Sequence, residues 1–203
     1  MRQRFVRSAE WARSLAEETV PLIHEAGNPY YDWFFGGAEQ AREAVEALYA
    51  SPASEVSATR VTLLLEDERL RGLYVALPGE ELAECRLADT LLLVARDSGA
   101  TRAELRRRIE LARGLFADVL PADCYLSKIG VVRASRGQGL GGTILDRVIA
   151  EARERGHSRV RLDVSAGNER ALALYAARGF AIVRERRVGP LVYLELVRDL
   201  AQP

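Results

Sequence analysis

Three glycines stand close together in the stretch RGQGLGG, at Gly137, Gly139 and Gly142. Their spacing, G-x-G-x-x-G, is that of the fingerprint with which dinucleotide-binding enzymes hold a pyrophosphate. Glycine suits this task because a backbone without Cβ atoms can approach a phosphate closely. The N–H groups at the start of a following helix can then donate to the phosphate oxygens. The stretch therefore predicts a site for a phosphate-bearing cofactor.

Two classes of cofactor fit such glycines. In an NAD-binding fold the first glycine follows its strand almost directly, whereas the residues RASR separate Gly137 from the strand expected before it. The acid at the distance expected for ribose binding, Asp163, stands inside an alternating strand, and only 40 residues follow it. A second register, Arg136-x-x-Gly139-x-Gly141, places backbone N–H groups around a pyrophosphate where a helix begins. The sequence favours this second register over NAD.

The elements around the glycines alternate between strand and helix. Apolar residues follow the glycines at the spacing of one helix face, and strictly alternating apolar residues come after them. The elements expected in this half are strands at 124–132, 160–164, 180–187 and 191–200 and helices at 144–152 and 169–178. The order β-α-β-α-β-β indicates a mixed α/β fold.

The preceding half is predicted from the same periodicities. Its expected elements are helices at 8–25, 38–50, 79–97 and 101–118 and two strands within 58–79 around a tight turn near 67–69. Pro21 is expected to shorten or kink the first helix. A chain of 203 residues can bury a core of its own, and no linker or repeat divides the sequence. We therefore expect a single domain over 1–203.

Composition argues against several classes of function. Basic and acidic residues balance, so the sequence gives no indication of a nucleic-acid or membrane partner. Cys85 and Cys124 stand far apart, and His24 and His157 lack metal-ligand spacing, so neither a disulfide framework nor a metal site is expected. The first residues lack the apolar core of a signal peptide, which makes the cytoplasm the expected compartment. Lys128 is the one lysine, which we attribute to composition.

Two segments of the sequence resemble motifs of the GNAT superfamily of N-acetyltransferases. YLSKIGVVRASRGQGLGGTILDRVIAEA, at 125–152, resembles the strand, glycine loop and helix of this superfamily. RVRLDVSAGNERALALYAARGFAIV, at 159–183, resembles the next strand and helix, with the pattern N-x-x-A-x-x-L-Y-x-x-x-G-F beginning at Asn168. The detailed match covers about 125–184, under a third of the chain. It implies a mixed, mostly antiparallel sheet flanked by helices and splayed at a CoA cleft.

The resemblance implies that acetyl-CoA is the cosubstrate and that its acetyl group passes to a primary amine by direct attack. The splayed strand would pair with the pantetheine arm, and the glycine loop would hold the pyrophosphate. The cofactor-binding residues implied in this way are Val131, Val132, Arg136, Gly137, Gln138, Gly139, Leu140, Gly141, Gly142, Asn168 and Tyr175.

The resemblance also implies catalytic roles. Tyr175 would be the general acid that protonates the leaving thiolate, since the pKa values of a phenol and a thiol differ by about 2 units; a core aromatic is the alternative. A backbone N–H near Val131 would polarise the thioester carbonyl. Asp163 matches a position where some relatives carry a glutamate and is the candidate general base; a solvated strand charge is the alternative. Tyr125 and Ser127 are further candidates that act through water.

Residues 1–120 are expected to shape the acceptor site, and residues 121–203 to bind acetyl-CoA. The aromatic run NPYYDWFF would form an apolar pocket, a cage for a cation or a cluster under a loop. Its aromatic members are Tyr30, Tyr31, Trp33, Phe34 and Phe35. The helices expected within 79–118 would cover the acceptor cleft or form a homodimer contact. The acceptor, a small-molecule or peptide amine, is not identified, and a catalytically silent acyl-CoA-binding module is the alternative function.

Overall fold

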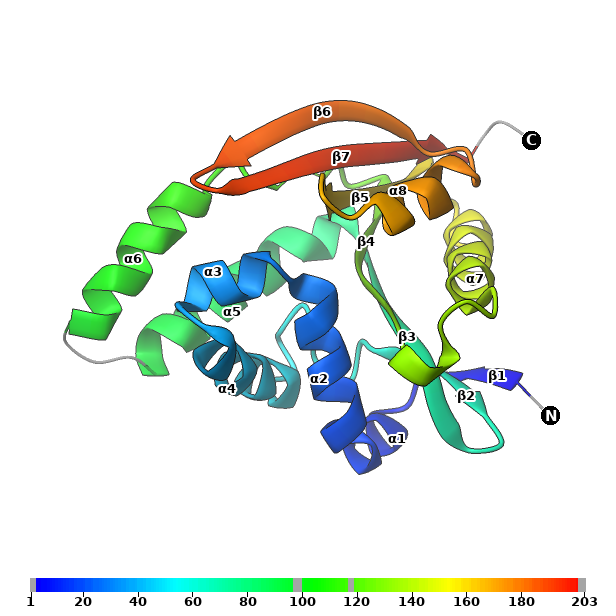
Figure 1. Cartoon of the computed structure of the whole chain (residues 1–203), viewed down its shortest axis with the longest axis horizontal. Coiled ribbons are helices and arrows are strands. Elements are labelled where there is room, and N and C mark those ends of the chain that lie inside the picture. The colour runs from blue at the N-terminus through cyan, green and yellow to red at the C-terminus, as the bar shows by residue number, and fades with distance from the viewer. Residues whose placement is uncertain (1–2, 97–99, 117–118, 201–203) are drawn as a thin grey trace.

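The computed structural model describes residues 3–96, 100–116 and 119–200. The strands within these ranges are β1 (Gln3–Val6), β2 (Thr62–Glu66), β3 (Arg69–Pro78), β4 (Asp123–Val131), β5 (Arg159–Ser165), β6 (Ala181–Val188) and β7 (Leu191–Asp199). They form one sheet in the order β1-β2-β3-β4-β5-β7-β6 (Figure 1). Neighbouring strands run antiparallel except β4 and β5, which are parallel.

Helices cover both faces of this sheet. They are α1 (Ala9–Ser14), α2 (Ala16–Gly27), α3 (Tyr30–Phe35), α4 (Ala38–Ala50), α5 (Gly79–Arg96), α6 (Ala100–Ala112), α7 (Leu140–Glu154) and α8 (Glu169–Ala176), with a 3₁₀ turn, η1, at Arg133–Ser135. The order β4-α7-β5-α8-β6-β7 is the β-α-β-α-β-β order predicted for this half. The sheet and its helices confirm the predicted α/β fold class.

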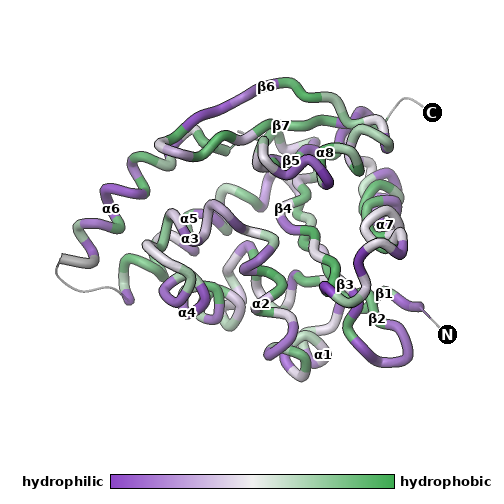
Figure 2. Tube along the Cα trace, in the orientation of Figure 1, coloured by the Kyte–Doolittle hydropathy of each residue, from purple (hydrophilic) through white to green (hydrophobic). Residues whose placement is uncertain are grey.

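Alternation along the central strands divides the interior into two cores. Because successive side chains of a strand point to opposite faces, Leu73 and Val75 of β3 pack with α1 to α6. Tyr74 and Ala76 of the same strand pack with α7 and α8. Figure 2 shows hydrophobic residues along these central strands, whereas α6 is largely hydrophilic. The sheet is therefore a wall between two layers of helices.

The helix α7 presents the predicted apolar face to the sheet. Ile144, Leu145 and Val148 are each at most 1% exposed. The helix ends before Gly156, whose φ of 76° is one that glycine adopts without strain. This packing sets the position at which α7 begins, and with it the position of the glycines that precede the helix.

The first predicted helix, 8–25, is wrong as a single element. The chain breaks it at Leu15 into α1 and α2, and Pro21 lies inside α2 without ending it. The Ser14 hydroxyl donates to the carbonyl of Trp11 at 2.9 Å, in competition with the backbone ladder at this point. A polar side chain, and not the proline, therefore marks the break.

Other boundaries also differ from the prediction. Residues 3–6 form a strand that pairs with β2, and the aromatic run folds as the short helix α3. The helix expected at 101–118 ends at Ala112, where Gly114 adopts a φ of 78° and turns the chain. Residues 97 and 117–118 of the two predicted helices lie outside the described ranges.

The packing of α7 can be tested with one substitution. Ile144→Ala is expected to lower the free energy of unfolding by about 2–5 kcal/mol, since it deletes buried carbon atoms and leaves a cavity. Leu87→Ala, at a side chain that is 60% exposed, should change the same quantity by about 0.5 kcal/mol or less. Urea denaturation measures both, and equal losses would contradict the packing described here.

Candidate active site

The strand β4 has a neighbour on both sides only at its start. It pairs with β5 as far as Tyr125, whereas its pairing with β3 continues to Val131. β5 meanwhile stays paired with β7 as far as Ser165. The register between β3 and β4 shifts at Ser127, which forms a bulge. Over the described part of both strands, the sheet therefore opens between β4 and β5, as predicted.

The glycine turn (residues 136–139) leads from η1 into α7. Gly137 and Gly139 have φ values of 81° and 79°, in the left-handed region that favours glycine. A Cβ atom at either position would meet nothing within 4 Å, so the backbone faces open space. The N–H groups of Gly142 and Thr143 donate to the carbonyl of Gly139. The N–H groups before them in the first turn have no acceptor within the helix and can bind an anion.

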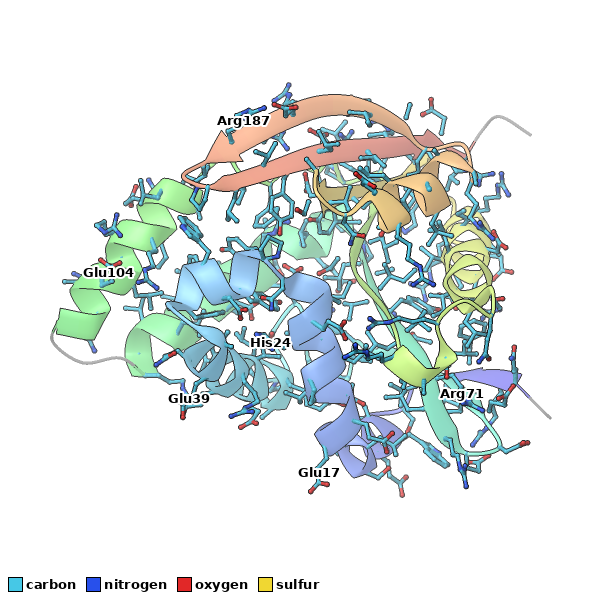
Figure 3. The ribbon with its side chains drawn as sticks, viewed as in Figure 1. Glu17, His24, Glu39, Arg71, Glu104 and Arg187 are labelled. Carbon is cyan, nitrogen blue, oxygen red and sulfur yellow. The ribbon has the colours of Figure 1, made fainter. Side chains whose placement is uncertain are left out.

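Side-chain contacts hold the glycine turn against the sheet. Arg136 Nε donates to the carbonyl of Val131 at 3.0 Å, and Nη2 lies 2.7 Å from Glu25 Oε1 on α2. On the other side, Arg71 (labelled in Figure 3) donates to the buried hydroxyl of Ser135 in η1 at 3.1 Å. Because the guanidinium of Arg136 points back to β4 and α2, the turn offers its backbone to a ligand.

A cavity of about 550 Å³, here named the turn cavity, lies between the glycine turn, β4 and α8. Nine of the eleven residues predicted to bind the cofactor line it: Val131, Arg136, Gly137, Gly139, Leu140, Gly141, Gly142, Asn168 and Tyr175. The other two do not line it, since Gln138 is exposed and Val132 packs against the core formed with α1 to α6. Leu22, Glu25 and Ala26 of α2 also line this cavity.

The helix α8 and its cap supply the predicted site residues Asn168 and Tyr175 to the lining. Asn168 caps the helix, and its Oδ1 accepts from the N–H of Ala171 at 3.1 Å. Tyr175 is 5% exposed, and its ring centroid lies 5.6 Å from that of Phe180. Burial raises the pKa of Tyr175 well above its ordinary value, so the hydroxyl keeps its proton at neutral pH.

A second cavity, of about 370 Å³, is here named the ring cavity. It begins on β4 where the turn cavity ends, because Ser127 and Lys128 line the ring cavity while residues 129–131 line the turn cavity. Its aromatic lining consists of Tyr30, Tyr31, Phe34, Phe35, Phe116, Tyr125 and Tyr193. Trp33, the fifth aromatic of the predicted run, packs against the cores instead.

Asp163 lies in the ring cavity and not beside Tyr175. The Tyr125 hydroxyl donates to Asp163 Oδ2 at 3.0 Å, and Arg186 Nη1 lies 3.5 Å from Oδ1. Burial and the nearby Asp163 raise the pKa of Tyr125, so its hydroxyl stays protonated as the donor. The residues predicted as general acid and general base are therefore in different cavities.

Charged residues that the sequence did not single out surround the bulge of β4. Glu55, in the loop before β2, accepts a hydrogen bond from Ser127 Oγ, with Lys128 Nζ 3.6 Å and Arg86 Nε 3.5 Å away. Burial opposes ionisation, but the two cations hold the pKa of Glu55 below its ordinary value. Asp89 on α5 accepts the backbone N–H of Glu55 at 3.2 Å, and burial raises the pKa of Asp89 to about 6.

The sequence of this region is similar to sequences of known proteins. Residues 103–180 match the model of the acetyltransferase (GNAT) family, a range that includes β4, the glycine turn, α7, β5 and α8. The sequence of this segment is therefore similar to that of GNAT acetyltransferases. The chain is 43% identical over 53 residues to mycothiol acetyltransferase of Jonesia denitrificans, which is 26% of this chain and 17% of that protein. It is 36% identical over 74 residues to the uncharacterized N-acetyltransferase YdgE of Bacillus subtilis, covering 36% and 47% of the two chains.

A solved structure of an N-acetyltransferase is similar in fold over nearly the whole chain. An N-acetyltransferase from Staphylococcus aureus superposes with a TM-score of 0.68 at 16% identity, covering 96% of this chain and 100% of that one. The chain spans less than half the length of the curated relatives named above. Among the described residues, no helix has the length and apolarity needed to cross a membrane, and no group of His, Cys, Asp or Glu side chains is placed to hold a metal ion.

The raised pKa of Asp89 makes the stability of this chain depend on pH. Its folded pKa lies above the ordinary value of 3.8, so the folded chain binds this proton more tightly than the unfolded chain does. The resulting stabilisation is complete below about pH 4 and is lost as the pH rises through about 6. The variant Asp89→Asn has no ionisable carboxyl group at this position.

We therefore expect the stability difference, wild type minus Asp89→Asn, to fall by about 2–3 kcal/mol from about pH 4 to about pH 7. Urea denaturation at a series of pH values measures this difference, and carboxyl groups shared by both proteins cancel. A difference that does not change with pH would show that the Asp89 carboxyl titrates normally.

Proposed function

We propose that this protein belongs to the GNAT superfamily and transfers an acetyl group from acetyl-CoA to a primary amine of a small molecule or a protein. The observation that carries the proposal is the turn cavity, whose wall joins the glycine turn, the open edge of β4 and Tyr175. A cosubstrate with a pyrophosphate and a distant thioester needs such groups at its two ends. The ring cavity starts on the next residues of β4, where an acceptor can meet the thioester.

The residues of the turn cavity fit acetyl-CoA. The first N–H groups of α7 would bind the pyrophosphate, with about 0.3–1 kcal/mol added by the helix dipole. Beyond Tyr125, the peptide groups on the open edge of β4 would pair with the amides of the pantetheine arm. Asn168 would contact the same arm while it caps α8. When bound, acetyl-CoA supplies an activated thioester, which the acceptor nitrogen attacks directly.

The proposed chemistry assigns one task to each group. Tyr175 protonates the leaving thiolate, because its buried phenol is neutral and lines the turn cavity. A backbone N–H of β4 near Val131 polarises the carbonyl oxygen. Asp163 is the proposed base and acts through the Tyr125 hydroxyl, because that hydroxyl and Arg186 both contact its oxygens.

Both halves of the chain contribute to the proposed reaction. Residues from 1–120 and from 121–203 line each of the two cavities, which supports one domain with an acceptor half and a cosubstrate half. Because α5 and α6 line the ring cavity, we assign them to the acceptor site in preference to a homodimer contact. Cys85 and Cys124 are both free. Free thiols are typical of a reducing compartment, and on this ground we propose the cytoplasm.

Ligand-induced stabilisation tests the choice of cosubstrate. Acetyl-CoA or CoA at about a hundred times its dissociation constant should add about 2.7 kcal/mol to the free energy of unfolding. NAD and NADP should add nothing. Thermal unfolding with the four ligands in parallel measures the effect, and stabilisation by NAD would instead support the dinucleotide interpretation of the glycines.

Tyr175→Phe tests the general acid. Removal of the hydroxyl should lower kcat by about a hundredfold, while the KM for acetyl-CoA changes by no more than about twofold. Tyr49→Phe is the matched control, because it removes a buried hydroxyl that bonds to the carbonyl of Ala12, outside both cavities. Initial rates of thiol release give these constants.

Unchanged kcat in Tyr175→Phe would remove this residue as the acid. A wild-type protein that acetyl-CoA stabilises, but that releases no thiol with any amine, would instead be the catalytically silent acyl-CoA-binding module.

A further inference from the structure

The aromatic part of the lining of the ring cavity comes from α3, from the segment after α6, and from β4 and β7. The rings support one another. Tyr30 stacks on Phe34 with centroids 5.1 Å apart and meets the edge of Phe116 at 4.8 Å. Phe116 in turn lies 5.5 Å from Tyr193. Offset and edge-to-face contacts of this kind fix ring positions, so the wall is formed before a ligand arrives.

The helix that carries most of these rings, α3, is held by contacts from two other helices. Asp32 of α3 accepts from His24 Nε2 of α2 at 2.7 Å (His24 is labelled in Figure 3). Arg108 of α6 donates to the carbonyl of Phe34 at 2.9 Å. These contacts join α2, α3 and α6 around the ring cavity, so the shape of the cavity is set by three helices.

Cations of the chain itself already occupy ring faces in this cavity. Lys128 Nζ lies 5.3 Å from the centroid of the Tyr31 ring. The guanidinium of Arg86 lies 5.0 Å from the Tyr125 ring and 5.7 Å from the Phe116 ring. An ammonium group that entered among the rings would meet these positive charges. The aromatic wall is therefore suited to an apolar body and not to a second cation.

Of the three carboxylates that the structure describes in the lining, two face cations, and the third, Asp89, accepts from the backbone N–H of Glu55. Glu55 has Lys128 and Arg86 as neighbours, and Asp163 has Arg186. A polyamine would need further carboxylates to neutralise each of its ammonium groups, because a buried unpaired charge is costly. An acceptor with one amine needs a single polar contact.

That contact is available at the junction of the two cavities. Glu55 hydrogen-bonds with Ser127, the bulged residue of β4, and both residues line the ring cavity. The turn cavity begins two residues further along β4, at Ile129. A nitrogen that accepts the acetyl group has to reach this junction, and Glu55 is the carboxylate beside it.

We propose that the ring cavity binds a small monoamine whose body is aromatic or branched and apolar, with its nitrogen directed towards Glu55. This inference rests on the proposed acetyl transfer and names the acceptor class. The rings hold the apolar body, the cations on the ring faces disfavour further ammonium groups, and Glu55 accepts a hydrogen bond from the amine. The volume of the ring cavity, about 370 Å³, is near the small end of the range for ligand pockets.

The first experiment compares acceptors with the full-length chain and acetyl-CoA. The amines are 2-phenylethylamine, 3-methylbutylamine, putrescine, spermidine and a hexapeptide with a free N-terminus. Thiol release and the mass of the acetylated product are measured for each. We expect kcat/KM for the first two amines to exceed that for the other three by about tenfold or more. A polyamine or the peptide as the best acceptor would overturn the proposal.

The second experiment alters the wall. Phe116→Ala should raise the KM for 2-phenylethylamine by about tenfold, with the KM for acetyl-CoA unchanged, and Phe116→Leu should lie between it and the wild type. Leu111→Ala is the control, because Leu111 is on α6 but is 44% exposed and outside the lining. Circular dichroism checks that each variant is folded. Equal KM values for 2-phenylethylamine in folded Phe116→Ala and wild type would overturn the proposal.

Calorimetry separates this inference from the proposed reaction. 2-Phenylethylamine is titrated into the CoA-saturated wild type and into Phe116→Ala. Binding that is weakened in the variant, without acetylation of any amine, would support an apolar monoamine as the ligand of the ring cavity and contradict the transferase. Acetylation of other amines without binding of 2-phenylethylamine would support the transferase and overturn the acceptor class.

Discussion

Both cavities depend on the early end of the pairing between β4 and β5. These strands separate after Tyr125, but β3 holds one of them and β7 holds the other to its end. A sheet can open at its centre in this way because each strand keeps one neighbour, and only one row of peptide groups on each strand is left to find another partner. The opening gives one ligand a backbone edge on β4, and the bulge at Ser127 marks where the second cavity begins.

A buried row of ion pairs links the paired starts of β4 and β5 to β6 and β7. Asp123, which is fully buried, accepts from Arg159 and Arg161, and Arg161 also pairs with Glu195. Arg186 joins Glu195 to the carboxylate predicted as the base. Such pairs add little net stability, because desolvation offsets their attraction, but loss of one partner leaves a buried charge. They therefore favour a single register of β5, β6 and β7.

Local features of the structure could be predicted from the sequence, because local chemistry determines them. Residues 137–142 combine backbone freedom with the start of an amphipathic helix, and both signals lie within one short stretch. Contacts between residues that are far apart in the sequence could not be predicted, because tertiary packing determines them. Glu55 comes from an irregular loop and Arg86 from a helix, and they meet Ser127 only once the sheet has formed. Asp163 was recognised as a candidate, but its partners lie on other strands, so its position relative to Tyr175 was not accessible.

The single lysine of the chain has a chemical consequence. Lys128 lies at the junction of the cavities with its side chain 12% exposed. All other residues counted as Lys or Arg in the sequence are arginines. A guanidinium stays protonated at neutral pH, so arginine offers no nucleophilic nitrogen to an activated acyl group. The ammonium of Lys128 is itself engaged by Ser127 and Glu55. The basic side chains of this protein are therefore poor targets for acylation.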